Sequence, residues 1–263
     1  MTAESIAPDE PTSPKPGYHG GPEMTLMEHL LELRNRVIIC GIALIIATMI
    51  SFYFWETILG WLLAPARSEV QDFKVSSFSP IDRITTIFKI GLYGGLIISS
   101  PVLIYETLAY VVPGLTPKER RMIAPGMLGV VAFLIMGMAF AYWVILPASL
   151  GFLLSVGKDE IQNVTGIKEY IDFVTRIVFW VGISFEMPMV IALAARLGLV
   201  RARQLLSFWR YAIVIIFVIA AVITPTPDPF NQTLVGGPLF FLYFVGVLFA
   251  WLVQKPREKA PAE

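Results

Sequence analysis

Long, predominantly apolar segments alternate with short polar connections along the chain, a pattern that predicts helices crossing a membrane. There are six such segments, at about Val37–Phe54, Ile84–Val112, Ile123–Leu146, Ile171–Ala195, Tyr211–Ile223 and Leu234–Val253. The pattern therefore predicts an all-α integral membrane protein with six transmembrane helices, of which the last two are short.

The fifth segment, Tyr211–Ile223, is shorter than an ordinary span. Its thirteen residues would reach only about 20 Å of a hydrocarbon core that is about 30 Å thick. A re-entrant helix is therefore one interpretation. Against it, residues 196–210 are basic while residues 224–233 contain no Lys or Arg, as expected on opposite sides of a membrane. A crossing helix would require local thinning of the bilayer.

Composition supports a membrane protein and narrows its chemistry. Apolar residues make up 56% of the chain and charged residues 15%, against roughly 45–50% and 25% in soluble domains. The net charge of zero gives no indication of a nucleic-acid partner. One cysteine and two histidines exclude an intrachain disulfide and make a metal site built from these residues improbable. No metalloprotease, hydrolase, phosphate-binding or dinucleotide-binding motif is present, so we expect neither enzyme activity nor a cofactor.

Basic residues indicate which way the chain crosses the membrane. If both termini are cytoplasmic, thirteen basic residues fall in the cytoplasmic segments and five in the opposite ones, as the positive-inside rule requires. Residues 1–23 are rich in proline and acidic residues and predict a disordered cytoplasmic tail. Residues 24–253 form the predicted membrane domain, and residues 254–263 a cytoplasmic C-terminal tail.

The stretch before the first span carries candidate binding residues. Thr25 and Glu28 have the spacing of a capping box, which predicts a helix beginning at about Leu26. Glu32 and Arg36 then lie one turn apart on one face of that helix. They form either an ordinary surface ion pair or part of a cytoplasmic binding surface.

A second candidate lies in the turn between the second and third spans. Thr116, Pro117 and Glu119 have the pattern of another capping box. Glu119 therefore either caps a helix or converges with Glu32 on one cationic ligand, since both are predicted on the same membrane face.

Glu186 lies near the middle of the fourth predicted span, where a charged side chain costs roughly 2.5–3.5 kcal/mol. Pro188 follows it and removes a helical hydrogen bond to the carbonyl of Ser184. The sequence therefore predicts a kinked, locally polar site in the membrane. The alternative is a glutamate satisfied by other helices of the chain.

Other polar residues have simpler interpretations. Glu106 lies near the inner end of the second span, where its side chain can reach lipid headgroups. Lys89 and Arg176 lie one or two turns inside the outer ends of their helices and can reach the interface in the same way. The proline-rich segment at residues 224–233 is predicted to be a rigid outer turn.

Several short motifs occur together in a characteristic order: HLLELRNR before the first span, LLAP after it, PGLTPKERR, FAYWVILP, GISFEMP and TPTPDPFNQT. In this order and at this topology, the chain resembles the TatC family, the polytopic receptor subunits of the twin-arginine protein translocase. The resemblance covers about residues 24–253.

The resemblance implies a cytoplasmic surface that binds signal peptides. The acidic residues of that surface fall on Glu32 and Glu119, and its basic positions on Arg34 and Arg36. Tyr110 stands where the family commonly has phenylalanine, and its ring can pack in the same way.

The resemblance also implies a surface for partner helices. The intramembrane acid of the family falls on Glu186, and the polar positions before the last helix fall on Asp228 and Gln232. Pro65 matches the proline of the first outer connection, so Pro65 and Pro188 are predicted to be structural.

By this resemblance the protein binds twin-arginine signal peptides and exports folded proteins with the proton-motive force. Its partners would be single-span subunits of the TatA and TatB type in a hetero-oligomer, in the cytoplasmic membrane of a prokaryote. A proton-coupled small-solute transporter that uses Glu186 is the alternative, and an assembly scaffold is a third possibility. A transporter of that kind predicts internal repeats with broken helices, and no such repeat is evident.

Overall fold

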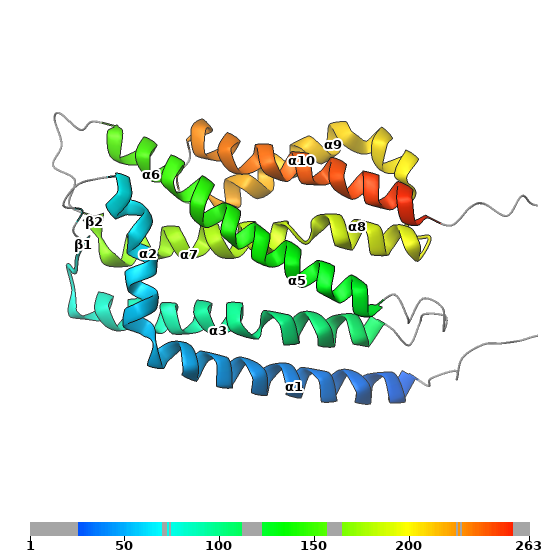
Figure 1. The fold of residues 1–263 in the computed structure, drawn as a ribbon, viewed down its shortest axis with the longest axis horizontal. Helices are drawn as coiled ribbons and strands as arrows, with labels where there is room; N and C mark the ends of the chain where they lie inside the picture. The colour runs from blue at the N-terminus through cyan, green and yellow to red at the C-terminus, as the bar shows by residue number, and fades with distance from the viewer. Residues whose placement is uncertain are drawn as a thin grey trace, which may run out of the picture.

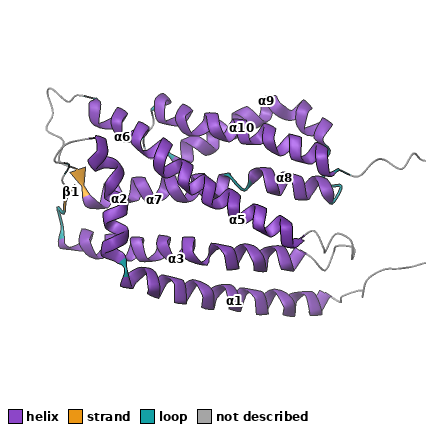
Figure 2. Ribbon diagram, viewed as in Figure 1, coloured by secondary structure: helices purple, strands orange, loops and turns teal. Residues whose placement is uncertain are grey.

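The computed structural model describes residues 26–69, 73, 75–111, 123–156, 165–224, 226 and 228–254. Nearly all of these residues are helical, and the long helices run roughly along one direction while α2 (Trp55–Glu69) runs across it (Figure 2). The predicted tails at residues 1–23 and 255–263 lie outside the described residues.

Six helical spans are long and apolar enough to cross a membrane, and each contains 22 to 30 residues. Their helices are α1 (Leu26–Tyr53), α3 (Pro80–Val111), α5 (Ile123–Phe140) continuing through the π-helical turn η2 (Ala141–Ile145) into α6 (Leu146–Ser155), α7 (Ile167–Ser184) with α8 (Met187–Arg196), α9 (Ala202–Ile223), and α10 (Pro229–Val253). The start of α1 and the end of α10 lie at the same end of the bundle, on the right in Figure 1. The prediction of an all-helical protein with six spans is confirmed.

The fifth span differs from the prediction in length. α9 begins at Ala202, nine residues before the predicted Tyr211, and runs for 22 residues without a break. Its length of about 33 Å is enough to cross a bilayer without thinning it. The thirteen-residue length was wrong because the apolar pattern stops at Arg210, whereas the helix does not. At 22 and 25 residues, the last two spans are still the shortest of the six.

Two spans are interrupted, for different reasons. In the third, the N–H of Leu146 bonds the carbonyl of Ala141, five residues earlier, in a π-helical turn. In the fourth, α7 ends at Ser184 and α8 begins at Met187 with a proline in its first turn. Proline cannot donate to the preceding turn, so the predicted break at this position is confirmed.

The connection after α1 contains a helix that the sequence did not predict. α2 (Trp55–Glu69) packs on α6, at the end of the bundle opposite the described ends of the chain (Figure 1). Beside it lie two strands of two residues each, β1 (Val75–Ser76) and β2 (Thr165–Gly166), which pair in parallel. Together these elements form a compact cap on that end.

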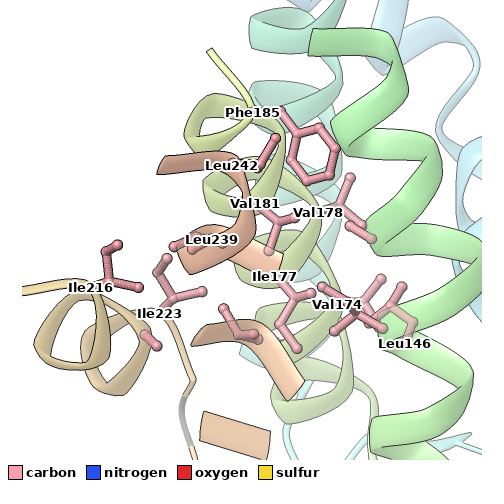
Figure 3. Close-up of a cluster of buried hydrophobic side chains, with 14 of the residues drawn as sticks. Leu146, Val174, Ile177, Val178, Val181, Phe185, Ile216, Ile223, Leu239 and Leu242 are labelled. Carbon is pink, nitrogen blue, oxygen red and sulfur yellow. The ribbon is translucent and has the colours of Figure 1, made fainter. Parts of the chain in front are cut away.

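The core is centred on α7, which packs against α3, α5 and α9. Val174, Ile177 and Val181 are completely buried, and their spacing places them along one face of the helix. They belong to one cluster with side chains of α6, α9 and α10, in which Leu146 and Leu239 lie near the α7 side chains and Ile216 lies farther away (Figure 3). Some buried hydroxyl groups bond their own helices: Thr175 donates to Ile171 O at 2.6 Å. Such bonds satisfy polar groups where water is absent.

α1 packs almost entirely on α3, through small residues. A Cβ atom at Gly91 would lie 2.7 Å from the ring of Phe52, and one at Gly95 would lie 2.7 Å from the Cα of Thr48. Between these contacts, Ser51 donates to the carbonyl of Ile90 at 3.2 Å. Glycines four residues apart allow membrane helices to approach closely, and this approach brings polar residues of α1 and α3 together.

Candidate functional site

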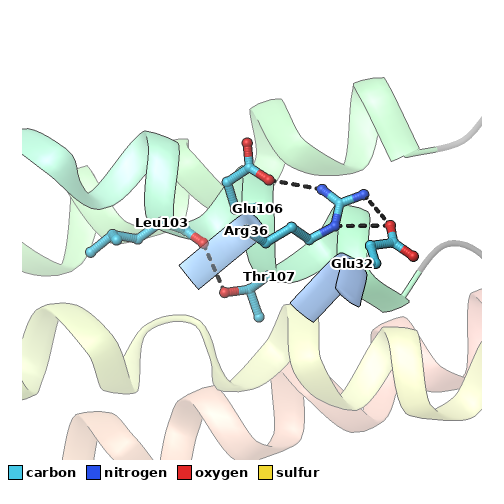
Figure 4. Close-up of polar contacts among 5 residues, drawn as sticks. All are labelled: Glu32, Arg36, Leu103, Glu106 and Thr107. Carbon is cyan, nitrogen blue, oxygen red and sulfur yellow. Dashed lines mark hydrogen bonds and ion pairs between the residues drawn. The ribbon is translucent and has the colours of Figure 1, made fainter. Parts of the chain in front are cut away.

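Three charged residues connect α1 and α3 near the end of the bundle where the described chain begins and ends. We call Glu32, Arg36 and Glu106 the α1–α3 ion cluster. Arg36 donates to Glu32 Oε1 from Nη2 at 2.5 Å and from Nε at 3.0 Å. Its Nη1 donates to Glu106 Oε2 at 2.8 Å. Figure 4 shows the guanidinium group between the two carboxylates.

Counting the described residues alone, the α1–α3 ion cluster carries one uncompensated negative charge, because two carboxylates face one guanidinium. The side chains of Glu32 and Arg36 are 20% and 23% exposed, and that of Glu106 only 10%. Glu32 Oε2 is buried and has no hydrogen-bond partner among the described residues. The cluster thus has both the charge and an unsatisfied, though buried, acceptor for one more cation.

Glu106 was not among the predicted site residues, and its interpretation as a headgroup contact was wrong. It lies 70 residues from Arg36 in sequence and is buried between α1 and α3. A signal was present nonetheless, since Glu106 interrupts an apolar segment and a buried carboxylate needs a partner.

Tyr110 and Arg34 occupy different surroundings. The ring of Tyr110 stacks on His29, with centroids 4.4 Å apart and planes inclined by 16°. This contact lies one turn beyond Glu106 on α3, so Tyr110 also joins α3 to α1, next to the α1–α3 ion cluster. Arg34 is exposed and donates to Asn35 Oδ1 at 3.3 Å, apart from the ion cluster. Glu119 lies outside the described residues.

The second predicted site is the break in the fourth span. Glu186 N bonds the carbonyl of Ile183 at 3.0 Å, and Glu186 O accepts from Val190 N at 3.0 Å. Glu186 therefore ends one helix and begins the next. Both of its carboxyl oxygens are buried without a hydrogen-bond partner among the described residues. The backbone of Leu134 lies near the carboxyl group, but an amide in mid-helix already donates to its own helix.

Two glycines allow neighbouring helices to close on this break. A Cβ atom at Gly137 of α5 would lie 2.6 Å from Phe185, and one at Gly246 of α10 would lie 3.2 Å from the Cα of Pro188. α5 and α10 thus pack closely on the residues before and after Glu186.

Asp228 and Gln232 both have partners within the chain. Asp228 caps α10: its Oδ1 accepts from the N–H of Asn231 at 2.7 Å, and its Oδ2 from the Asn231 amide at 2.9 Å. Burial raises the pKa of Asp228, but the hydrogen bonds from Asn231, Thr226 and Phe230 outweigh it and hold the pKa below its ordinary value. Gln232 donates to the carbonyl of Phe217 on α9 at 3.0 Å.

The three residues predicted to dock partner helices lie at different depths. Gly246, which packs on Pro188, follows Asp228 by 18 residues and Gln232 by 14. These separations correspond to about 27 and 21 Å along α10. Glu186 is therefore not in one site with Asp228 and Gln232.

Pro65 has a structural consequence within α2. A proline at this position cannot donate to the carbonyl of Trp61, four residues earlier. That carbonyl instead accepts from the hydroxyl of Tyr142 in η2, at 2.8 Å. The neighbouring Leu62 carbonyl accepts from Tyr170 of α7 at 2.7 Å. Pro65 thus helps to fasten α2 to the spans beneath it.

Lys89 does not simply extend to the interface, as the sequence suggested. It forms an ion pair with Asp172 of α7 across 83 residues of sequence. The pair connects α3 to the central helix at the level of the cap.

These features define a multi-pass membrane protein whose polar side chains connect its helices to one another. Among the described residues, no group of three His, Cys, Asp or Glu side chains could hold a metal ion. The model of the Sec-independent protein translocase protein (TatC) family matches residues 28–238.

Relatives and a solved structure agree with that match. The chain is 37% identical over 232 residues to the chloroplastic Sec-independent protein translocase protein TATC of Arabidopsis thaliana, covering 88% of this chain and 67% of that protein. It is 36% identical over 238 residues to the TatC protein of Aquifex aeolicus, covering 90% and 98%. A crystal structure of the twin arginine translocase receptor TatC superposes with a TM-score of 0.78 at 36% identity, covering 86% of this chain and 99% of that one.

The chain therefore belongs to the TatC family and is a component of a Sec-independent, twin-arginine protein translocase. It is a membrane transport protein and not an enzyme. The small-solute transporter considered from Glu186 finds no support in these comparisons.

Proposed function

We propose that this protein is the receptor of a twin-arginine translocase, which binds signal peptides through the α1–α3 ion cluster. It recruits single-span subunits of the TatA and TatB type and exports folded proteins with the proton-motive force. It lies in the cytoplasmic membrane of a prokaryote, with both termini in the cytoplasm.

The observation that carries the proposal is the uncompensated charge of the α1–α3 ion cluster. Glu32 Oε2 is an acceptor without a partner among the described residues, and its neighbours leave one negative charge to be neutralised. A guanidinium group binds a carboxylate through two parallel hydrogen bonds, which an ammonium group cannot do. The cluster is therefore suited to arginine more than to lysine.

A second acidic residue would receive the second arginine of the signal peptide. Glu119 follows α3 by eight residues and is proposed for this role from the family resemblance. Arg34 is proposed to exclude loosely bound cations by repulsion, and Tyr110, packed on His29, to support the binding surface.

The test is the affinity of two synthetic signal peptides, one with Arg-Arg and one with Lys-Lys, for the purified chain. Glu32→Gln and Glu119→Gln should each weaken Arg-Arg binding by about 1.5–3 kcal/mol, the scale of one charged hydrogen bond. Glu56→Gln is the matched control, since Glu56 is an exposed carboxylate of α2 at the opposite end of the bundle. An unchanged preference for Arg-Arg in both variants would refute the proposal.

The orientation needs its own test. A cysteine introduced at Asp228, in a chain whose Cys40 has been replaced, should react with an impermeant reagent only from the side opposite the cytoplasm. Labelling from the cytoplasmic side would reverse the proposed orientation.

For partner helices we propose two levels of contact on the protein. Glu186 offers a carboxyl group at mid-membrane, and Asp228 and Gln232 offer polar groups near the start of α10. Because the oxygens of Glu186 are buried, a partner reaches them only when the side chains that cover them move. Disulfide mapping with cysteines along a partner helix should detect contacts at both levels, and contacts with α1 alone would contradict this proposal.

A further inference from the structure

The carboxylate proposed to bind the ligand is already in contact with a guanidinium group, that of Arg36. Arg36 presents its Nε–Nη2 edge to Glu32 Oε1, at 3.0 and 2.5 Å. This is the chemical group that a twin-arginine peptide would bring. The site therefore contains an internal competitor for its own ligand.

Arg36 holds its two partners through different atoms. Nη1 alone reaches Glu106, at 2.8 Å, while the opposite edge reaches Glu32. The guanidinium group can thus leave Glu32 without leaving Glu106. Figure 4 shows Glu106 on the side of Arg36 away from Glu32, and Glu106 is the least exposed of the three.

We infer that Arg36 occupies the position of the ligand arginine on Glu32 when no peptide is bound. Glu106 is then the positioning residue that holds Arg36 when a ligand arginine binds Glu32. This inference rests on the proposed function, because it assigns Glu32 to the ligand. Glu106 acts through Arg36 and does not touch the peptide.

Charge explains why Glu106 is needed. With the ligand bound, two guanidinium groups face two carboxylates and the cluster is neutral. Without Glu106, Glu32 and Arg36 already neutralise each other, and a ligand cation would enter next to an uncompensated guanidinium. Repulsion between like charges would then oppose binding.

The competitor lowers the affinity for any cationic ligand. The free energy needed to move Arg36 off Glu32 is the same whichever cation enters, so it changes the affinities for Arg-Arg and Lys-Lys peptides by the same factor. The preference for arginine comes from the new contact with Glu32, since an ammonium group cannot reproduce the two-bond geometry of a guanidinium group. Removing Arg36 should therefore strengthen the binding of both peptides by a similar factor.

The experiment measures the affinity of fluorescent Arg-Arg and Lys-Lys peptides for the full chain in lipid nanodiscs. Glu106→Gln should weaken Arg-Arg binding by about tenfold or more, the scale of one charged hydrogen bond. The double variant Arg36→Gln/Glu106→Gln should recover most of that loss, because it also removes the Arg36 guanidinium group that competes with the ligand for Glu32. Thr107→Val is the matched control, since the exposed Thr107 donates only within its own helix, to Leu103 O at 2.8 Å.

The outcomes separate the inference from the proposed function. If the double variant binds as weakly as Glu106→Gln, Glu106 touches the ligand or supports the fold, and the inference is overturned while the proposed function stands. If Glu32→Gln binds like the wild type, both are overturned. Should Glu106→Gln fail to fold, Glu106→Asp retracts the acceptor by one methylene and should weaken binding in the same direction.

Discussion

Replacing Gly95 with alanine would put a methyl group into the closest part of the α1–α3 contact. The new Cβ would lie 2.7 Å from the Cα and 2.9 Å from the N of Thr48. Both are backbone atoms, which cannot rotate out of the way. α1 must therefore shift, and its shift would draw Arg36 away from Glu106.

The magnitude follows from two opposing effects. Overpacking a close contact costs about 1–3 kcal/mol, and a backbone neighbour places this case at the upper end. Alanine favours a helix over glycine by up to about 1 kcal/mol. We expect a net loss of about 2 kcal/mol, or about 4–8 °C in melting temperature for a chain of this size.

The assay is thermal unfolding of the purified chain in detergent, with peptide affinity as a second measurement. Gly41→Ala is the matched control, because a Cβ at Gly41 of α1 meets nothing within 4 Å. It should be neutral or slightly stabilising, so the two variants should differ by about 3 kcal/mol. Equal melting temperatures for the two variants would refute the packing argument.

Three further predictions concern single side chains. Tyr142→Phe should lower the free energy of unfolding by about 0.5–1.5 kcal/mol in a thermal melt, because it removes the hydrogen bond from the Tyr142 hydroxyl to the Trp61 carbonyl. Because the pKa of Asp228 is lowered, its stabilisation of α10 is complete above the ordinary carboxyl pKa of about 3.9 and is lost as the pH falls through the lowered value. Hydrogen exchange of the Asn231 backbone amide should show this pH dependence, and Asp228→Asn should abolish it. In a transport assay, Glu186→Gln should be milder than Glu186→Ala, because an amide still hydrogen-bonds within the membrane, and equal defects would exclude a hydrogen-bonding role.

The spans could be predicted because a charged side chain is costly in a membrane, so each span is mostly apolar in its own local sequence. Predominantly apolar segments therefore indicated all six crossings. The break at Pro188 was predictable for a similar reason, since proline removes a hydrogen bond only four residues away. The start of α9 was missed because Arg203 and Arg210 end the apolar pattern without ending the helix.

Contacts between distant parts of the chain could not be predicted in this way. The ion pair of Arg36 with Glu106 spans 70 residues, and that of Lys89 with Asp172 spans 83. Each depends on which helices are neighbours and on their rotation, and apolar patterning does not determine either. The candidate site was thus predicted at Glu32 and Arg36, which are one turn apart, but not at Glu106, which completes it.

The π-helical turn in the third span changes which side of the following helix, α6, faces its neighbours. One additional residue in a turn rotates the next helix by about 100° relative to an uninterrupted α-helix. α5 can therefore present one face to α7 while α6 presents an unrelated face to α2. Deleting a single residue from Ala141–Ile145 would leave a straight helix of nearly the same length, but would turn one of these two faces toward lipid. The third span therefore consists of two helices whose packing faces are set independently. A substitution on the α7-facing side of α5 leaves the α2-facing side of α6 unchanged.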